Sequence, residues 1–157
     1  MFITRFCGTL LLNLETLREK TDEVGGVLIA AHPLRNFFNR PPYNVNLLFG
    51  DWKVQPETPE QAAEHELFSL VDCIEVTNGA NSEKENNFTL EIANYLDKPA
   101  TGGSDAHSVQ GIGKSFTVFE NNISDRDTLL TEIKAKRFFP AEGLNIGDVQ
   151  RFELNHS

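Results

Sequence analysis

The residues best suited to chemistry are one aspartate and two histidines that follow predicted strands. Asp105 and His107 flank a single alanine after the small-residue strand 100–103, and His32 follows the apolar run 27–31. The carboxyl ends of parallel strands meet at one rim in a β/α arrangement, so we expect these side chains to gather there. Imidazole and carboxylate ligands suit Zn, Mn or Fe better than Ca or Mg. Each residue alone is typical of an ordinary strand end, and only their concurrence at one rim favours a metal site.

Further polar residues are predicted at the same rim and elsewhere. Glu75 and Asn78 lie at the end of the second predicted strand. Gly102 and Gly103 precede the Asp-Ala-His triplet, where glycine lets the backbone turn sharply or approach a neighbour closely. His65 lies between two glutamates in a predicted helix, so we expect it on a solvated face.

The elements that must position these residues alternate between helix and strand. Capping residues and apolar periodicity predict helices over 13–24, from Thr58 to about Leu70, from Ser82 to about Leu96, and after a cap at Ser124. Apolar or small-residue runs predict strands over 27–31, 73–76, 100–103 and 116–119, the first of them buried on both faces. Such alternation favours an α/β fold with mostly parallel strands and outer helices. Part of a β/α barrel and a small open sheet both fit this order.

A long irregular stretch, residues 34–57, separates the first strand from the second predicted helix. It contains five aromatic residues, which favour an ordered segment over a disordered one. The stretch fits a surface excursion fixed by its own aromatic side chains, and it fits an active-site cover equally well.

The length and composition of the chain argue against several classes of function. The 157 residues fit a single domain, 1–157. A net charge of −9 argues against direct nucleic-acid binding, which needs a basic face. The longest apolar run, 27–31, is too short to cross a membrane. The two cysteines show no disulfide or CxxC spacing, so we expect a cytoplasmic protein.

Three segments together resemble one known family. They read Gly-Gly-Val-Leu-Ile-Ala-Ala-His-Pro at 25–33, Asp-Cys-Ile-Glu-Val-Thr-Asn-Gly at 72–79 and Thr-Gly-Gly-Ser-Asp-Ala-His at 101–107. In this order they resemble the C-terminal portion of the PHP-family metal-dependent phosphoesterases, and Lys-Arg-Phe-Phe-Pro at 136–140 follows that family's closing pattern. The resemblance implies a partial distorted β/α barrel, a cluster of Zn, Mn or Fe ions, and hydrolysis of a phosphorylated small molecule or nucleotide.

The resemblance also implies roles for individual residues. His32, Asp105 and His107 correspond to metal ligands of the family. Glu75 and Asn78 would line the same rim. Arg35, shortly after the His-Pro pair, fits a phosphate contact and fits a solvated arginine equally well.

The sequence departs from the family pattern before residue 32. In the family pattern, a first strand is followed by His-x-His and then by a further His and a Glu. No histidine precedes His32 in this chain. Two explanations follow. The chain is a truncated PHP domain that works with a missing N-terminal half, or it is a non-catalytic remnant that binds a partner or forms a homo-oligomer. Loss of the first strands would leave an open sheet edge for a second chain to cover.

Overall fold

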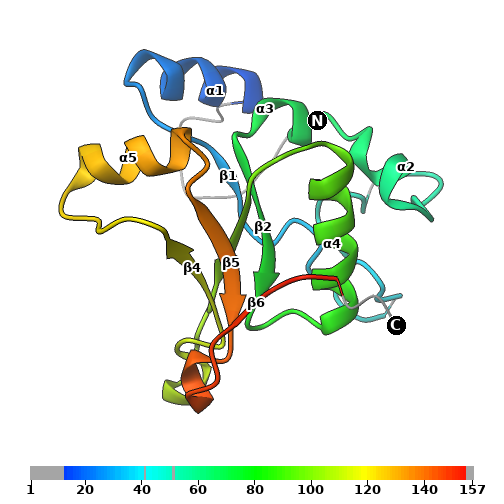
Figure 1. Ribbon diagram of the computed structural model, residues 1–157. Helices are drawn as coiled ribbons and strands as arrows, with labels where there is room; N and C mark the ends of the chain where they lie inside the picture. Colours follow the sequence, from blue (N-terminus) through cyan, green and yellow to red (C-terminus); the bar gives the residue numbers. More distant parts are fainter. Residues whose placement is uncertain (1–12, 41, 51, 155–157) are drawn as a thin grey trace.

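Two three-stranded sheets form the centre of the structure, a computed structural model that describes residues 13–40, 42–50 and 52–154 (Figure 1). The first sheet is parallel, in the order β1 (Ile29–Ala30), β2 (Cys73–Asn78) and β3 (Ala100–Gly103). The second is antiparallel, in the order β4 (Ser115–Phe119), β5 (Phe138–Glu142) and β6 (Gln150–Arg151). The mixed α/β class is confirmed, while the described residues form no closed barrel.

The first strand is shorter and more exposed than the apolar run predicted. Only Ile29 and Ala30 pair with β2, and Ile29 is 40% exposed. The N–H and C=O groups of Ala30 face β2, so those of Ile29 and Ala31 face the opposite side. No other strand of the described segments pairs with that side. The prediction of a strand buried on both faces is therefore wrong, because the Ile29 side chain is exposed on one face of the sheet.

The antiparallel sheet departs from the prediction of mostly parallel strands. Helix α5 (Arg126–Lys134) connects β4 to β5 without crossing the sheet, so β5 returns beside β4 in the opposite direction. Phe119 and Phe138 are paired across the two strands, and Ile133 of α5 packs with Phe138 in a small core. The helix therefore covers one end of the strand pair. Its N-cap is Asp125, one residue after the predicted Ser124.

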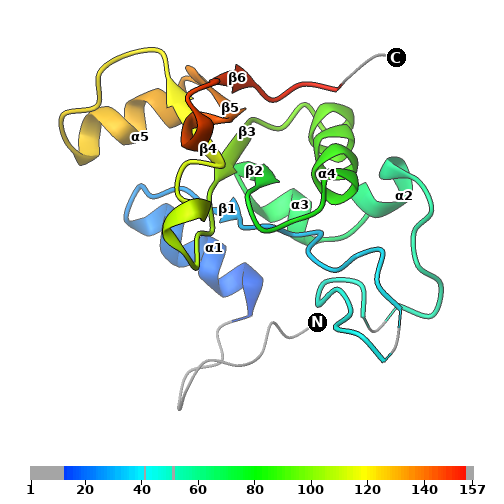
Figure 2. The ribbon, with the colours of Figure 1, turned by 90° about the horizontal axis from the view of Figure 1, so that it is seen from below.

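Four further helices surround the parallel strands. They are α1 (Leu14–Glu23), α2 (Pro59–Ala63), α3 (Leu67–Leu70) and α4 (Glu83–Tyr95). Figure 2 shows α2 and α4 to one side of β2 and α1 to the other. None of these described helices has the length and hydrophobicity needed to cross a membrane.

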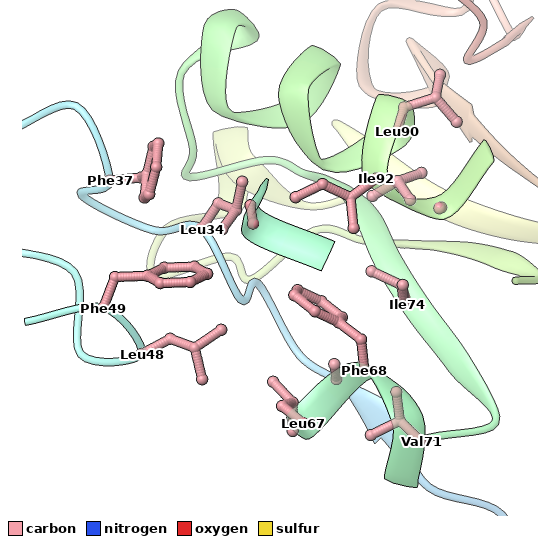
Figure 3. Close-up of a cluster of buried hydrophobic side chains, with 14 of the residues drawn as sticks. Leu34, Phe37, Leu48, Phe49, Leu67, Phe68, Val71, Ile74, Leu90 and Ile92 are labelled. Carbon is pink, nitrogen blue, oxygen red and sulfur yellow. The ribbon is translucent and has the colours of Figure 1, made fainter. Parts of the chain in front are cut away.

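The main hydrophobic core lies between β2, α4, α3 and the loop that follows β1 (Figure 3). Phe37 and Phe49 of this loop are buried, as are Phe68 of α3 and Ile74 of β2. The described residues of 34–57 are therefore fixed by their own aromatic side chains. This confirms the prediction that the stretch is ordered and not disordered.

His65 is buried where a solvated position was predicted. The helix expected from Thr58 to Leu70 is interrupted, and His65 lies between α2 and α3 with only 4% exposure. Its ring stacks on Trp52 with centroids 5.6 Å apart, and its Nδ1 accepts a hydrogen bond from the Leu67 N–H. Burial lowers the pKa of His65. A neutral ring that completes an aromatic cluster explains this position better than a solvated one.

Candidate functional site

The carboxyl ends of the three parallel strands carry the polar residues predicted there. His32 follows β1, Asn78 ends β2, and Asp105 follows β3. His32 and Asp105 both have left-handed backbone conformations, with φ values of 34° and 44°. Such conformations cost on the order of 1 kcal/mol each in a residue other than glycine, and they are common at functional sites.

Glu75 connects all three strand ends. Its Oε2 accepts hydrogen bonds from the His32 N–H at 2.7 Å and from the Asn78 side-chain amide at 3.0 Å. Its Oε1 lies so close to Gly103 that a Cβ at that position would overlap it. Gly103 therefore permits the close approach expected of the Gly-Gly pair. Glu75 fixes the spacing between β1, β2 and β3 at this rim.

Arg35 is held over the rim by side chains from two other segments. Its Nη2 forms an ion pair with the Asp105 carboxylate and donates to the Asn78 side-chain oxygen at 2.8 Å. Its Nε donates to the side-chain oxygen of Asn81 at 3.2 Å. Within the described part of the chain, Nη1 has no hydrogen-bond partner. The guanidinium is thus fixed in orientation and keeps one nitrogen available.

The charge of Asp105 depends on its neighbours at the rim. The hydrogen bond from Arg35 lowers the pKa of Asp105, and positive charge on His32 or His107 lowers it further. His32 and Asp105 follow β1 and β3, the two strands that flank β2 in the parallel sheet. His107 is exposed, and its Nδ1 is 2.9 Å from the Asp105 carbonyl oxygen.

Asn86 of α4 holds the end of β2 at the rim through two hydrogen bonds to the backbone of Asn78. Its Oδ1 accepts from the Asn78 N–H, and its Nδ2 donates to the Asn78 carbonyl, both at 3.2 Å. Helix α4 begins with a capping box in which Ser82 and Glu85 bond each other's backbone N–H groups. This cap fixes the first turn of the helix and hence Asn86.

The described residues do not by themselves fit a complete metal centre. No group of three or more His, Cys, Asp or Glu side chains in residues 13–40, 42–50 and 52–154 converges on one point. The Asp105 carboxylate faces the Arg35 guanidinium, and the Glu75 carboxylate is occupied by two hydrogen bonds. The ligand roles of His32, Asp105 and His107 therefore stay predictions.

Sequence reasoning missed the residues that hold Arg35 and Asn78. Asn81 and Asn86 contact the rim through side-chain amides, and neither lies at a strand end. Asn86 lies one turn into a helix whose capping box the sequence predicts. Its position on the helix face toward β2 was the one signal that could have identified it. The pairing of Arg35 with Asp105 joins residues 70 positions apart and left no local signal.

Comparisons with known proteins concern the second half of this site. No curated protein and no solved structure matches the chain. Residues 83–138 match the model of a family described as PHP-associated. The matched segment begins with α4 and includes β3, Asp105 and His107. It confirms the resemblance to PHP proteins and identifies 83–138 as a PHP-associated region, consistent with the C-terminal portion of a PHP-family protein.

Proposed function

We propose that the rim is the phosphate-binding part of a PHP-type phosphoesterase, an enzyme that hydrolyses phosphate esters. The observation that carries this proposal is the position of Arg35, fixed by Asp105, Asn78 and Asn81 with Nη1 left available. The two N–H groups of Nη1 can donate to phosphate oxygens, and arginine is a preferred residue for phosphate recognition. The neighbouring His32 and His107 add imidazole nitrogens able to form hydrogen bonds with phosphate oxygens.

The metal-dependent part of the proposal concerns three residues of this rim. We assign His32, Asp105 and His107 as this chain's contribution to a site for Zn, Mn or Fe. Since the described residues form no three-ligand group, the other ligands would come from another chain or from a segment outside the described residues. The same completion would extend the two sheets toward a distorted β/α barrel.

The test compares Arg35 with a matched arginine of the same loop. Arg40 is exposed and donates only to the carbonyl of Asn39 within the described residues, so Arg40→Gln is the control for Arg35→Gln. Hydrolysis of an aryl phosphate by the full chain is measured with zinc, manganese or ferrous ions, and again after chelation. We expect metal-dependent turnover, with KM raised about tenfold or more by Arg35→Gln alone, since a charge-assisted hydrogen bond is lost.

Two results would contradict the phosphoesterase proposal. The first is no turnover with any of the three ions and no binding of inorganic phosphate. The second is an equal effect of Arg35→Gln and Arg40→Gln on KM.

A non-catalytic function as a partner-binding or self-associating module is the second candidate. Among the described residues no strand pairs with the outer side of β1, and this favours the candidate, because Ile29 is 40% exposed beside outward-facing backbone groups. Such edges pair readily with another strand. The candidate predicts a dimer whose mass in light scattering is unchanged by chelator and reduced to the monomer by Ile29→Lys. A monomeric wild-type chain would exclude self-association.

A further inference from the structure

A cavity of about 480 Å³ lies beside the rim, between the start of α4 and the β5–β6 region. Figure 1 shows the segment at β6 running across toward α4. Asn78 and Asn81 line this cavity, and the same two side chains bind Arg35. The cavity and the proposed phosphate site therefore share a wall. Asn78 and Asn81 thus connect the cavity to the proposed phosphate site.

The lining of the cavity is rich in hydrogen-bonding groups and net negative. Its carboxylates come from Glu83, Glu142, Asp148 and Glu153, against the cations of Lys114 and Arg151. The Arg151 charge is engaged, since its Nε pairs with Glu153 at 3.2 Å and its guanidinium lies over the Phe139 ring. Burial, followed by the charge of Glu83, raises the pKa of Glu142. A second phosphate group would meet repulsion here.

The cavity offers no platform for a nucleobase. Phe152 is the single aromatic residue among the described residues that line it, and that side chain is 7% exposed and packed in the main core. Bases bind proteins largely by stacking on exposed aromatic rings. Hydroxyl groups, in contrast, can both donate to the carboxylates and accept from the amides of Asn81 and Asn87.

We propose that this cavity receives the alcohol portion of the substrate and selects an uncharged polyhydroxy group over a nucleoside or a second phosphate. The inference rests on the proposed phosphate site at Arg35 and narrows its substrate to phosphate esters of sugars or polyols. Asn87 is the best reporter, because it lines the cavity and makes no other hydrogen bond through its side chain within the described residues.

The experiment measures dissociation constants of the full chain for inorganic phosphate, glycerol phosphate and adenosine monophosphate. Asn87→Ala is compared with Asn94→Ala, an exposed asparagine of the same helix outside the cavity. We expect wild-type protein to prefer glycerol phosphate over both other compounds. Asn87→Ala should weaken glycerol phosphate about fivefold, the effect of one hydrogen bond, and leave inorganic phosphate unchanged. Asn94→Ala should change neither.

Several results would overturn the inference. Adenosine monophosphate binding as tightly as glycerol phosphate would do so, and so would equal losses in Asn87→Ala and Asn94→Ala. Titration with free glucose distinguishes the proposed polyol cavity from the proposed phosphate site. The measurement is the NMR signal of the Asn87 side-chain amide. If no phosphate compound binds but glucose shifts that signal, the cavity is a polyol site and the phosphoesterase proposal fails. If neither binds, both proposals fail.

Discussion

The two ends of the parallel sheet each carry an arginine–aspartate pair, and the two pairs have different partners. At the amino end, Asp72 accepts hydrogen bonds from Arg18 at 2.7 Å and from the Leu28 N–H at 2.6 Å. Arg18 also contacts the Leu70 carbonyl, so this pair connects α1, the start of β1 and the start of β2. Arg18 also pairs with the Asp22 carboxylate of the same helix, and the two backbone contacts between elements assign the amino-end pair to stability.

The carboxyl-end pair has only side-chain partners. Arg35 binds Asp105, Asn78 and Asn81, and no backbone carbonyl accepts from it within the described residues. The Arg35 side chain is 30% exposed and that of Arg18 is 16% exposed, whereas Asp105 is 25% exposed and Asp72 is 41% exposed. The amino-end pair thus fixes the fold through backbone groups, and the carboxyl-end pair presents the more exposed guanidinium.

Replacing the two aspartates should separate these roles most strongly. Under the proposed function, Asp105→Asn lowers turnover of a phosphate ester about 100-fold or more, because the variant loses the ion pair that orients Arg35 and a proposed metal ligand. Asp72→Asn leaves turnover per folded molecule within about twofold, because Asp72 lies at the opposite end of the strands. Steady-state kinetics, corrected for the folded fraction, measure both. Equal losses in the two variants would contradict the division of roles.

Stability should show the reverse order. Asp72→Asn weakens the bonds to Arg18 and Leu28, and we expect the free energy of unfolding to fall by about 1–2 kcal/mol, since the Asp72 side chain is 41% exposed. Asp105→Asn should cost less than half as much, because asparagine tolerates the left-handed conformation at φ 44°. Urea unfolding at neutral pH measures the difference. A larger loss for Asp105→Asn would make the carboxyl-end pair the structural one.

The pH dependence of Asp105 gives a subtler test. Arg35 lowers the pKa of Asp105 in the folded chain, so the ion pair stabilises the fold above the unfolded pKa, about 3.9. That stabilisation is lost as pH falls from there through the lower folded pKa. In metal-free protein, Arg35→Gln should return the pKa toward its ordinary value, as followed by carboxyl NMR titration. Arg18→Gln is the control, and a shift of Asp105 in that variant would show that the two ends are coupled.

His65, in the aromatic cluster, should give the smallest of these effects, a pH-dependent contribution to stability that does not involve either ion pair. Burial lowers the pKa of His65, so the folded chain binds fewer protons than the unfolded chain. Stability is therefore full above the unfolded pKa, about 6.5, and declines as pH falls below it. His65→Asn keeps an acceptor at the Nδ1 position for the Leu67 N–H and should remove this decline. Persistence of the same decline in urea unfolding of the variant would assign it to another group.

Local signals in the sequence predicted the elements that depend on neighbours in the chain. Asn13 caps α1 and Ser82 caps α4, as their side-chain types indicated. Gly103 permits a close approach, although the sequence did not show that Glu75 was the approaching group. Three strand ends were correctly expected to carry His32, Asn78 and Asp105. Caps, turns and strand ends are decided by a few adjacent residues.

The features that the sequence did not predict depend on distant contacts. Strand β5 contains Pro140, which argues against an inner strand, yet β5 lies between β4 and β6. Its pairing with β4 is decided by α5 and by the packing of Phe119 and Phe138. The burial of His65 likewise depends on Trp52, which comes from the loop before α2. The residues of β5 or of the segment around His65 do not by themselves indicate these partners.

The contacts of Glu75 have a mechanical consequence for the rim. One carboxylate is bonded to the segment after β1 and to the end of β2, and it lies close to Gly103 of β3. Because Glu75 contacts all three strand ends, we expect a ligand bound at one of them to restrict the movement of the other two. Ligand-induced movement should be concerted across the three strand ends, so that occupancy at one of them is transmitted to the others as a change in rigidity.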